Sequence, residues 1–166
     1  MTPARQERKQ HRGVVAAAAA IFVALVCGPA TIRAATSERV VVDWHTGLAI
    51  GGYDPVAYFT DGEPLPGKAD VELADSGAIW RFRNVGNRDA FAAHPEVYRP
   101  QFGGYDPLGV AQGIAVPGNA TFWLIRGERL FLFYDGERLK KFSADPERAI
   151  STADRKWPAV MQGLTP

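Results

Sequence analysis

The chain has 166 residues, with 19 basic side chains, 18 acidic ones and a formal net charge of +1. This length suits a single domain together with a targeting segment. Nucleic-acid binding needs a concentrated basic surface, so the near-neutral balance argues against a nucleic-acid partner.

Residues 1–30 have the layout of a secretory signal. Basic residues between Arg5 and Arg12 precede an uncharged apolar run over residues 14–26, and small residues continue to Ala30. This pattern predicts export, with cleavage near Ala30 and a periplasmic location. The apolar run is shorter than the roughly 20 residues of a spanning helix. The alternative is an uncleaved inner-membrane anchor with the domain facing the periplasm, and membrane contact is expected through this segment alone.

Cys27 is the only cysteine, and it lies inside the expected signal. Cleavage would therefore leave no thiol for a disulfide, a zinc–thiolate site or a nucleophile. Cleavage would also remove four basic residues and one acid, changing the net charge from +1 to −2. The core must then hold the domain, and 17 of the 18 aromatic residues lie beyond the signal.

Residues 31–47 are expected to lead into a domain over residues 48–163, and their run Val40-Val41-Val42 is a candidate first strand. A helix is expected to begin at Asp54-Pro55, since Asp caps free amides and Pro suits a first turn. Residues 71–82 alternate around Asp75-Ser76-Gly77 and predict a hairpin. A helix capped by Asn87 is expected to end at Pro95.

A second hairpin is predicted over residues 121–134, which are rich in β-branched and aromatic side chains around Arg126-Gly127-Glu128. Asp145-Pro146 begins a terminal helix with one apolar face, which Pro158 ends or kinks. The predicted fold is α+β, with two antiparallel hairpins, several short helices and a longer C-terminal helix.

The string Gly-Gly-Tyr-Asp-Pro occurs twice, at residues 51–55 and 103–107. Its glycines, capping acid and proline favour a sharp turn that opens a helix. The residues around the two copies do not align, so no wider internal repeat is expected.

The chain resembles the YHS domain family, in particular its exported bacterial members, over roughly residues 48–158. The resemblance is carried by five stretches, namely residues 49–59, 80–82, 89–91, 94–98 and 100–105, together with the 127–133 hairpin and Trp157-Pro158. It implies a small α+β domain, and related domains accompany heavy-metal transporters and some oxygenases. The usual suggestion for them is metal binding through cysteines.

This chain departs from the family at those cysteines. Relatives typically have Cys-Ala where Asp106-Pro107 stand, and the metal-associated branch has Cys in place of Ala57. A thiolate site for a soft metal therefore does not carry over, and a divalent ion held by oxygen or imidazole is the remaining metal option. On this interpretation the doubled pentapeptide is a coincidence created by the loss of a cysteine.

Asp54, Asp106 and His94 are the candidate metal ligands, and the same side chains could serve as general acid and base. The alternative is that both aspartates are helix N-caps and that His94 caps a helix end. The ligand-binding candidates are the two aspartates and four tyrosines: Tyr53, Asp54, Tyr58, Tyr98, Tyr105 and Asp106. Tyrosine rings of this kind are also common in cores, with the hydroxyl bonded to the backbone.

Three functions follow as hypotheses. The first is an exported YHS-like domain that, without catalysis, binds a small ligand or a divalent metal ion between the two turns. The second is a cofactor-free acid/base enzyme that uses Asp54 or Asp106 with His94. The third is an interaction module that docks to an envelope protein through exposed aromatic side chains.

Overall fold

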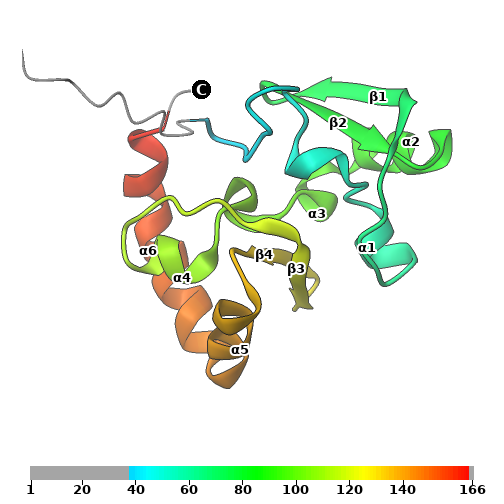
Figure 1. Ribbon diagram of the computed structural model, residues 1–166. Coiled ribbons are helices and arrows are strands. Elements are labelled where there is room, and N and C mark those ends of the chain that lie inside the picture. Colours follow the sequence, from blue (N-terminus) through cyan, green and yellow to red (C-terminus); the bar gives the residue numbers. More distant parts are fainter. Residues whose placement is uncertain (1–37, 165–166) are drawn as a thin grey trace, which may run out of the picture. The chain divides into compact units, whose positions relative to one another are not determined.

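The computed structural model describes residues 38–164, which belong to one unit (Figure 1). The expected signal, residues 1–30, lies outside this part of the chain. The first half contains the elements η1 (Ile50–Gly52), α1 (Ala57–Thr60), β1 (Lys68–Asp75), β2 (Ala78–Phe82), α2 (Val85–Ala93) and α3 (Pro95–Tyr98). The second half contains η2 (Gln101–Gly104), α4 (Pro107–Ala111), β3 (Asn119–Arg126), β4 (Arg129–Phe133), α5 (Gly136–Ala144) and α6 (Pro146–Gln162).

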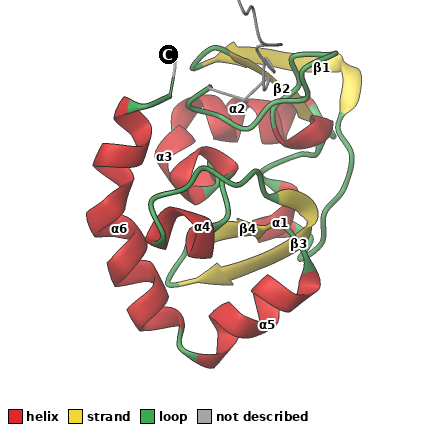
Figure 2. Ribbon diagram, turned by 60° about the vertical axis from the view of Figure 1, so that its left-hand side comes forward, coloured by secondary structure: helices red, strands yellow, loops and turns green. Residues whose placement is uncertain are grey.

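The predicted α+β class is confirmed. Strands β1 and β2 form one antiparallel two-stranded sheet, and β3 and β4 form another. Helix α6 runs alongside α4 in both ribbon views (Figures 1 and 2). In the part of the chain that the structure describes, no helix is both long and apolar enough to cross a bilayer.

Several helices begin or end at residues other than those expected from the sequence. Helix α2 is capped by Asn84, whose side chain accepts from the Asn87 backbone N–H, so Asn87 lies inside the helix. Helix α6 continues through Pro158 to Gln162. Helix α5 was not expected, because its start at Gly136 looks like a loop; Asp135 caps it by accepting from the Arg138 N–H.

The expectation of no internal repeat is wrong. The order of short helix, hairpin and two helices occurs twice, in a first copy (residues 49–98) and a second copy (residues 101–162). Strand β1 begins at Lys68 and β3 at Asn119, 51 residues later, while the two pentapeptides are 52 residues apart. One extra residue in the loop after α1 accounts for the difference. Because of it, no single spacing aligns both the pentapeptides and the hairpins of the two copies.

The two copies share their backbone details. Tyr53 bridges Pro66 as Tyr105 bridges Pro117, and both hairpins have a register shift four residues into the first strand. The residue before each Gly-Gly pair also has a positive φ, 45° at Ile50 and 55° at Phe102. Such φ values are uncommon outside glycine, so their recurrence identifies the two turns as the same structure.

The copies differ in how their hairpins are buried. Strand β2 alternates, with Trp80 and Phe82 inside and Ile79 exposed. Four consecutive residues of β4 are buried. Its leucines, Leu130 and Leu132, belong to the core of the first copy, whereas Phe131 and Phe133 belong to the core of the second. Strand β4 is therefore a wall shared by two cores.

The segment before the first copy closes over the second. Its run Val40-Val41-Val42 forms isolated contacts rather than a regular strand: Val41 donates to the Gly103 carbonyl at 2.7 Å, and Val42 bridges Ala49. A Cβ on Gly103 would overlap the Arg39 carbonyl oxygen, and Gly103 has φ 63°. The close approach of this segment thus requires glycine at position 103.

We expect Gly103→Ala to destabilise the fold more than Gly51→Ala, the matched change in the first copy. Both residues have positive φ, which costs an L-residue about 1–2 kcal/mol. At Gly51 the nearest atom to a new Cβ is 3.9 Å away. At Gly103 the overlap with Arg39 adds about 1–3 kcal/mol of overpacking. Urea unfolding of the full chain measures the difference, and equal losses would show that residues 38–41 do not lie against Gly103.

Candidate functional site

The Asp54 carboxylate is fully buried and links three segments of the first copy. One oxygen accepts from the Val56 N–H at 2.8 Å, within the turn itself. The other accepts from the Arg83 N–H at 2.8 Å, just after β2, and from the Asn87 side chain at 2.7 Å, in α2. Among residues 38–164 no basic side chain forms an ion pair with Asp54, so N–H donors alone stabilise its charge.

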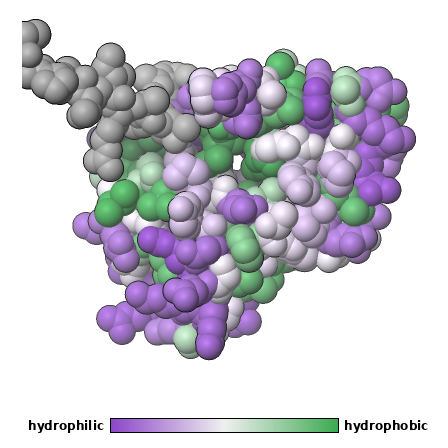
Figure 3. Space-filling model, in the orientation of Figure 1, coloured by the Kyte–Doolittle hydropathy of each residue, from purple (hydrophilic) through white to green (hydrophobic). Residues whose placement is uncertain are grey.

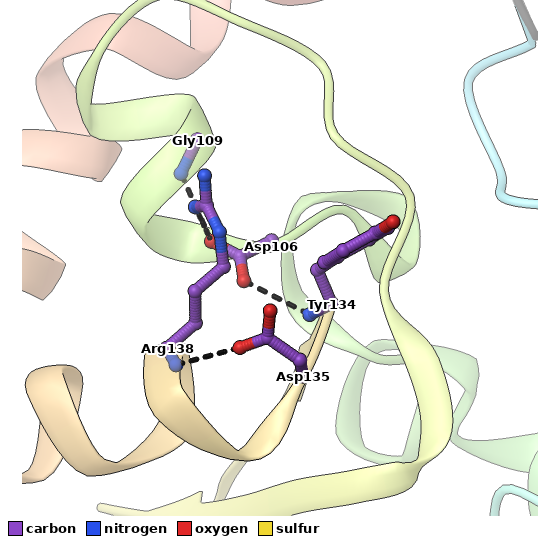
Figure 4. A network of polar contacts seen from close by, with 5 residues as sticks. All are labelled: Asp106, Gly109, Tyr134, Asp135 and Arg138. Atoms are coloured by element: carbon purple, nitrogen blue, oxygen red, sulfur yellow. Dashed lines mark hydrogen bonds and ion pairs between the residues drawn. The ribbon is translucent and has the colours of Figure 1, made fainter.

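Asp106 repeats this arrangement in the second copy (Figure 4). It is also fully buried, and it accepts from the Gly109 N–H at 2.9 Å and from the Tyr134 N–H at 3.0 Å. The third donor is the Arg138 guanidinium of α5, at 2.9 Å. Tyr134 and Arg138 stand 51 residues after Arg83 and Asn87, so these two donors have counterparts in the first copy, whereas the turn donor is two residues after Asp54 and three after Asp106.

Both carboxylates are therefore occupied by the fold. Each ties its own turn to the end of a hairpin and to the helix that follows, and neither lines any of the four cavities described. A substrate or ion between the turns would have to displace these donors. The helix-cap interpretation of Asp106 holds. For Asp54 it is wrong, because α1 begins at Ala57 with Val56 as its N-cap, and Asp54 accepts within its turn from the Val56 N–H instead.

His94 is not brought together with the aspartates. Its side chain is 65% exposed and lies 3.4 Å from Glu96, at the junction of α2 and α3. In residues 38–164 no group of three or more His, Cys, Asp or Glu side chains is placed to hold a metal ion. An acid/base pair of His94 with either buried carboxylate therefore has no common cleft in which to act.

The four candidate tyrosines lie in separate environments. Tyr58 is buried and donates to the Ala120 carbonyl at 2.8 Å, and burial raises the pKa of its hydroxyl above the ordinary value. Tyr105 is buried and donates to the Glu38 carbonyl at 2.6 Å. Tyr98 is half-buried against Phe59.

Of the six ligand candidates, Tyr53 alone lines one of the described cavities. This hollow of about 300 Å³ lies between residues 41–43, the first turn and residues 118–120. Its lining includes the acidic side chain of Asp43 and no basic one. The predicted set of tyrosines and aspartates therefore does not converge on one site.

Exposed apolar side chains are scattered over the described residues. Trp44 is 76% exposed and stacks on His45, and Tyr134 is 57% exposed beyond β4. On the face drawn in Figure 3 the residues over α5 are mainly hydrophilic, and hydrophobic residues appear in separate groups. Single exposed apolar residues are normal on protein surfaces, so this distribution adds no support to the docking hypothesis.

The largest of the described cavities lies elsewhere, beside Trp80. It measures about 440 Å³ and is bounded by the turn of the first hairpin, by residues 39–40 and by residues 99–103. Its lining residues are Arg39, Val40, Ser76, Gly77, Trp80, Arg99, Pro100 and Gly103. We call this the Trp80 cavity.

The two copies differ beside the Trp80 cavity. In the second copy Arg129 and Phe131 occupy the positions of Ala78 and Trp80, and the Arg129 guanidinium lies 5.2 Å from the Phe131 ring centre. Asp154 of α6 pairs with that guanidinium at 2.7 Å. In the first copy α3 ends at Tyr98, and Trp80 is contacted by Phe91 of α2 but by no counterpart of Asp154.

Reasoning from the sequence missed this cavity. A signal was present. When the two copies are aligned through their hairpins, Ala78 occupies the position of Arg129, so a small side chain corresponds to a large one. Helix α3 is also much shorter than α6. Since no repeat was expected, there was no reason to compare these positions, and the sequence did not predict the cavity.

The comparisons with known proteins identify no relative. No family model, curated protein or solved structure matches the chain.

We expect Asp54→Ala and Asp106→Ala each to lower the free energy of unfolding by about 3 kcal/mol, because each leaves buried N–H donors without an acceptor. The control is Asp145→Ala. Asp145 is an exposed N-cap that accepts only from the Arg148 N–H at 3.3 Å, so its loss should cost about 1 kcal/mol. Urea unfolding of the full chain, followed by tryptophan fluorescence, gives the three values. Similar losses at all three positions would show that the buried carboxylates do no more than an ordinary cap.

Proposed function

We propose that this chain is an exported binding domain that takes a small organic ligand into the Trp80 cavity without catalysing a reaction. The observation that carries the proposal is the cavity itself. At about 440 Å³ it falls within the range of roughly 300–1,000 Å³ typical of small-molecule sites.

The walls of the cavity suit a binding site that exists before the ligand arrives. Val40, Trp80 and Pro100 are apolar lining residues that are themselves well packed and buried, so they form a fixed apolar floor for the cavity. Trp80 is held by its indole N–H, which donates to the Asp75 carbonyl at 3.2 Å, and by its contact with Phe91. Ligand binding to such walls needs little reordering, which lowers the entropic cost of association.

The chemistry of the lining favours binding over catalysis. Its polar side chains are those of Arg39, Ser76 and Arg99, and none of the lining residues is a His, Cys, Asp, Glu, Lys or Tyr. General acid–base catalysis uses groups whose pKa lies near the working pH. Guanidinium groups instead stay charged and serve to bind and orient.

Export remains part of the proposal and is supported by the sequence alone, through the signal-like pattern of residues 1–30. The resemblance to exported YHS domains points to the same compartment. The structural description begins at residue 38 and does not bear on either statement.

A fragment screen by saturation-transfer NMR tests the binding proposal on the full chain. We expect several fragments of about 15 non-hydrogen atoms to bind with dissociation constants near 1 mM, as a ligand efficiency of about 0.3 kcal/mol per atom implies. Ser76→Trp places a large ring at the rim of the cavity and should abolish these signals. Glu128→Trp is the matched control, since Glu128 also has a positive φ in a hairpin turn but lines none of the described cavities.

If no fragment signal is lost in Ser76→Trp while Glu128→Trp behaves like the original chain, the cavity is not a binding site. The fold of both variants is checked by their unfolding temperatures, which should agree with each other because both replace a non-glycine residue at positive φ.

Export is tested by fractionating Gram-negative cells that express the full chain with a C-terminal tag. We expect the tagged protein in the periplasmic fraction, with an N-terminus near residue 31 by mass spectrometry. A full-length chain in the membrane fraction would support the uncleaved anchor, and a full-length chain in the cytoplasm would overturn export.

A further inference from the structure

The lining of the Trp80 cavity has an excess of positive charge. It includes two guanidinium groups, those of Arg39 and Arg99, and no carboxylate. The acidic groups nearest in the chain are Glu38, which lines an adjoining recess of about 70 Å³, and Asp75, which lies behind Arg99. Asp75 can offset one of the two charges and leaves the other without a counter-charge in the wall.

Within residues 38–164, not every N–H group of the Arg99 side chain has a hydrogen-bond partner. Its Nη2 pairs with the Asp75 carboxylate, and its guanidinium lies 5.9 Å from the centre of the Phe91 ring. Its Nε is buried and has no hydrogen-bond partner, the one such buried side-chain atom in residues 38–164. A buried N–H without an acceptor is costly, so an acceptor at this position would stabilise the folded protein.

Arg39 supplies the second cation. Its backbone is fixed by the close packing against Gly103, while its side chain forms no ion pair or hydrogen bond with any residue of 38–164. The two guanidinium groups therefore border one cavity, one held by Asp75 and one free to reach a ligand. Arginine binds carboxylates through paired N–H groups, which a lysine cannot imitate.

In the second copy, the chain itself supplies the carboxylate that binds a guanidinium group. There the guanidinium of Arg129 binds both oxygens of Asp154, at 3.1 and 2.7 Å, next to the buried ring of Phe131. The first copy has a buried ring and guanidinium groups at its cavity but no residue corresponding to Asp154. A carboxylate from outside the chain would supply what α6 supplies in the second copy.

We infer that the ligand is a small organic carboxylate with an apolar body. Its carboxylate is received by Arg99 and Arg39, and its apolar body lies over the floor that Val40, Trp80 and Pro100 form. This inference rests on the proposed function, because it names the class of ligand that the Trp80 cavity selects.

The test compares each carboxylate fragment with its uncharged carboxamide, for example indole-3-acetate with indole-3-acetamide, by NMR titration of the full chain. Hydrogen bonds to charged groups are stronger than neutral ones, so we expect the carboxylate to bind about tenfold more tightly or better. Acetate and inorganic phosphate lack an apolar body and should bind more weakly than indole-3-acetate.

Arg39→Gln and Arg99→Gln should each remove most of this preference, whereas the control Arg88→Gln, on α2 outside the cavity, should leave it unchanged. Since Arg99→Gln also breaks the pair with Asp75 and can weaken the fold, Asp75→Asn provides a second measurement. It releases the Arg99 guanidinium and removes a nearby negative charge, so indole-3-acetate should bind about threefold more tightly or better. A merely structural Arg99 would not produce that gain.

The outcomes separate the two proposals. Equal binding of carboxylate and carboxamide, or a preference that survives both arginine substitutions, overturns the choice of an anion while the Trp80 cavity remains a binding site. Fragment signals that are unaffected by Ser76→Trp overturn the binding site itself.

Discussion

The fold depends on a buried carboxylate in each Asp-Pro turn. Asp54 and Asp106 each accept three N–H donors, from the turn, from the residue after the hairpin and from the helix beyond it. A single acidic side chain thereby adds specific hydrogen bonds between three segments that also meet in the core, for example through Phe82 and Phe91. Burying a charge in this way is tolerable only when its acceptor capacity is used. The Gly-Gly pair before each aspartate supplies the positive φ angles that turn the carboxylate inwards.

The two copies of this unit are not equal. Strand β4 is packed on both faces because its leucines complete the first core while its phenylalanines complete the second. Tyr58 strengthens this junction, since it donates to Ala120 on β3 and meets the Trp123 ring at 5.2 Å. The long α6 closes the second copy, whereas the short α3 leaves Trp80 beside an open space. The Trp80 cavity thus lies where the two copies, which share one plan, differ.

This arrangement moves the functional question away from the paired turns. The expectation from the sequence was that the repeated pentapeptide is a coincidence at Asp106. Asp106 and Asp54 each accept from the turn, from the residue after the hairpin and from the following helix, so the repetition reflects equivalent positions in a repeated unit. The largest of the described cavities is lined instead by Arg39, Arg99 and the apolar residues around Trp80.

The sequence alone determined the elements whose causes are local. Alternation around Asp75-Ser76-Gly77 and Arg126-Gly127-Glu128 predicted both hairpins, and Asp145-Pro146 predicted the start of α6. It could not show α5, whose polar sequence is helical because Asp135 caps it and Phe142 is buried in the second core. Only the tertiary structure decided that Asp54 and Asp106 are occupied and that Arg39 and Arg99 share a cavity. Arg83 and Asn87 reach Asp54, and Arg39 reaches the neighbourhood of Arg99, across 29 to 60 residues of chain. Contacts between such distant residues depend on the path of the whole backbone, which no local pattern records.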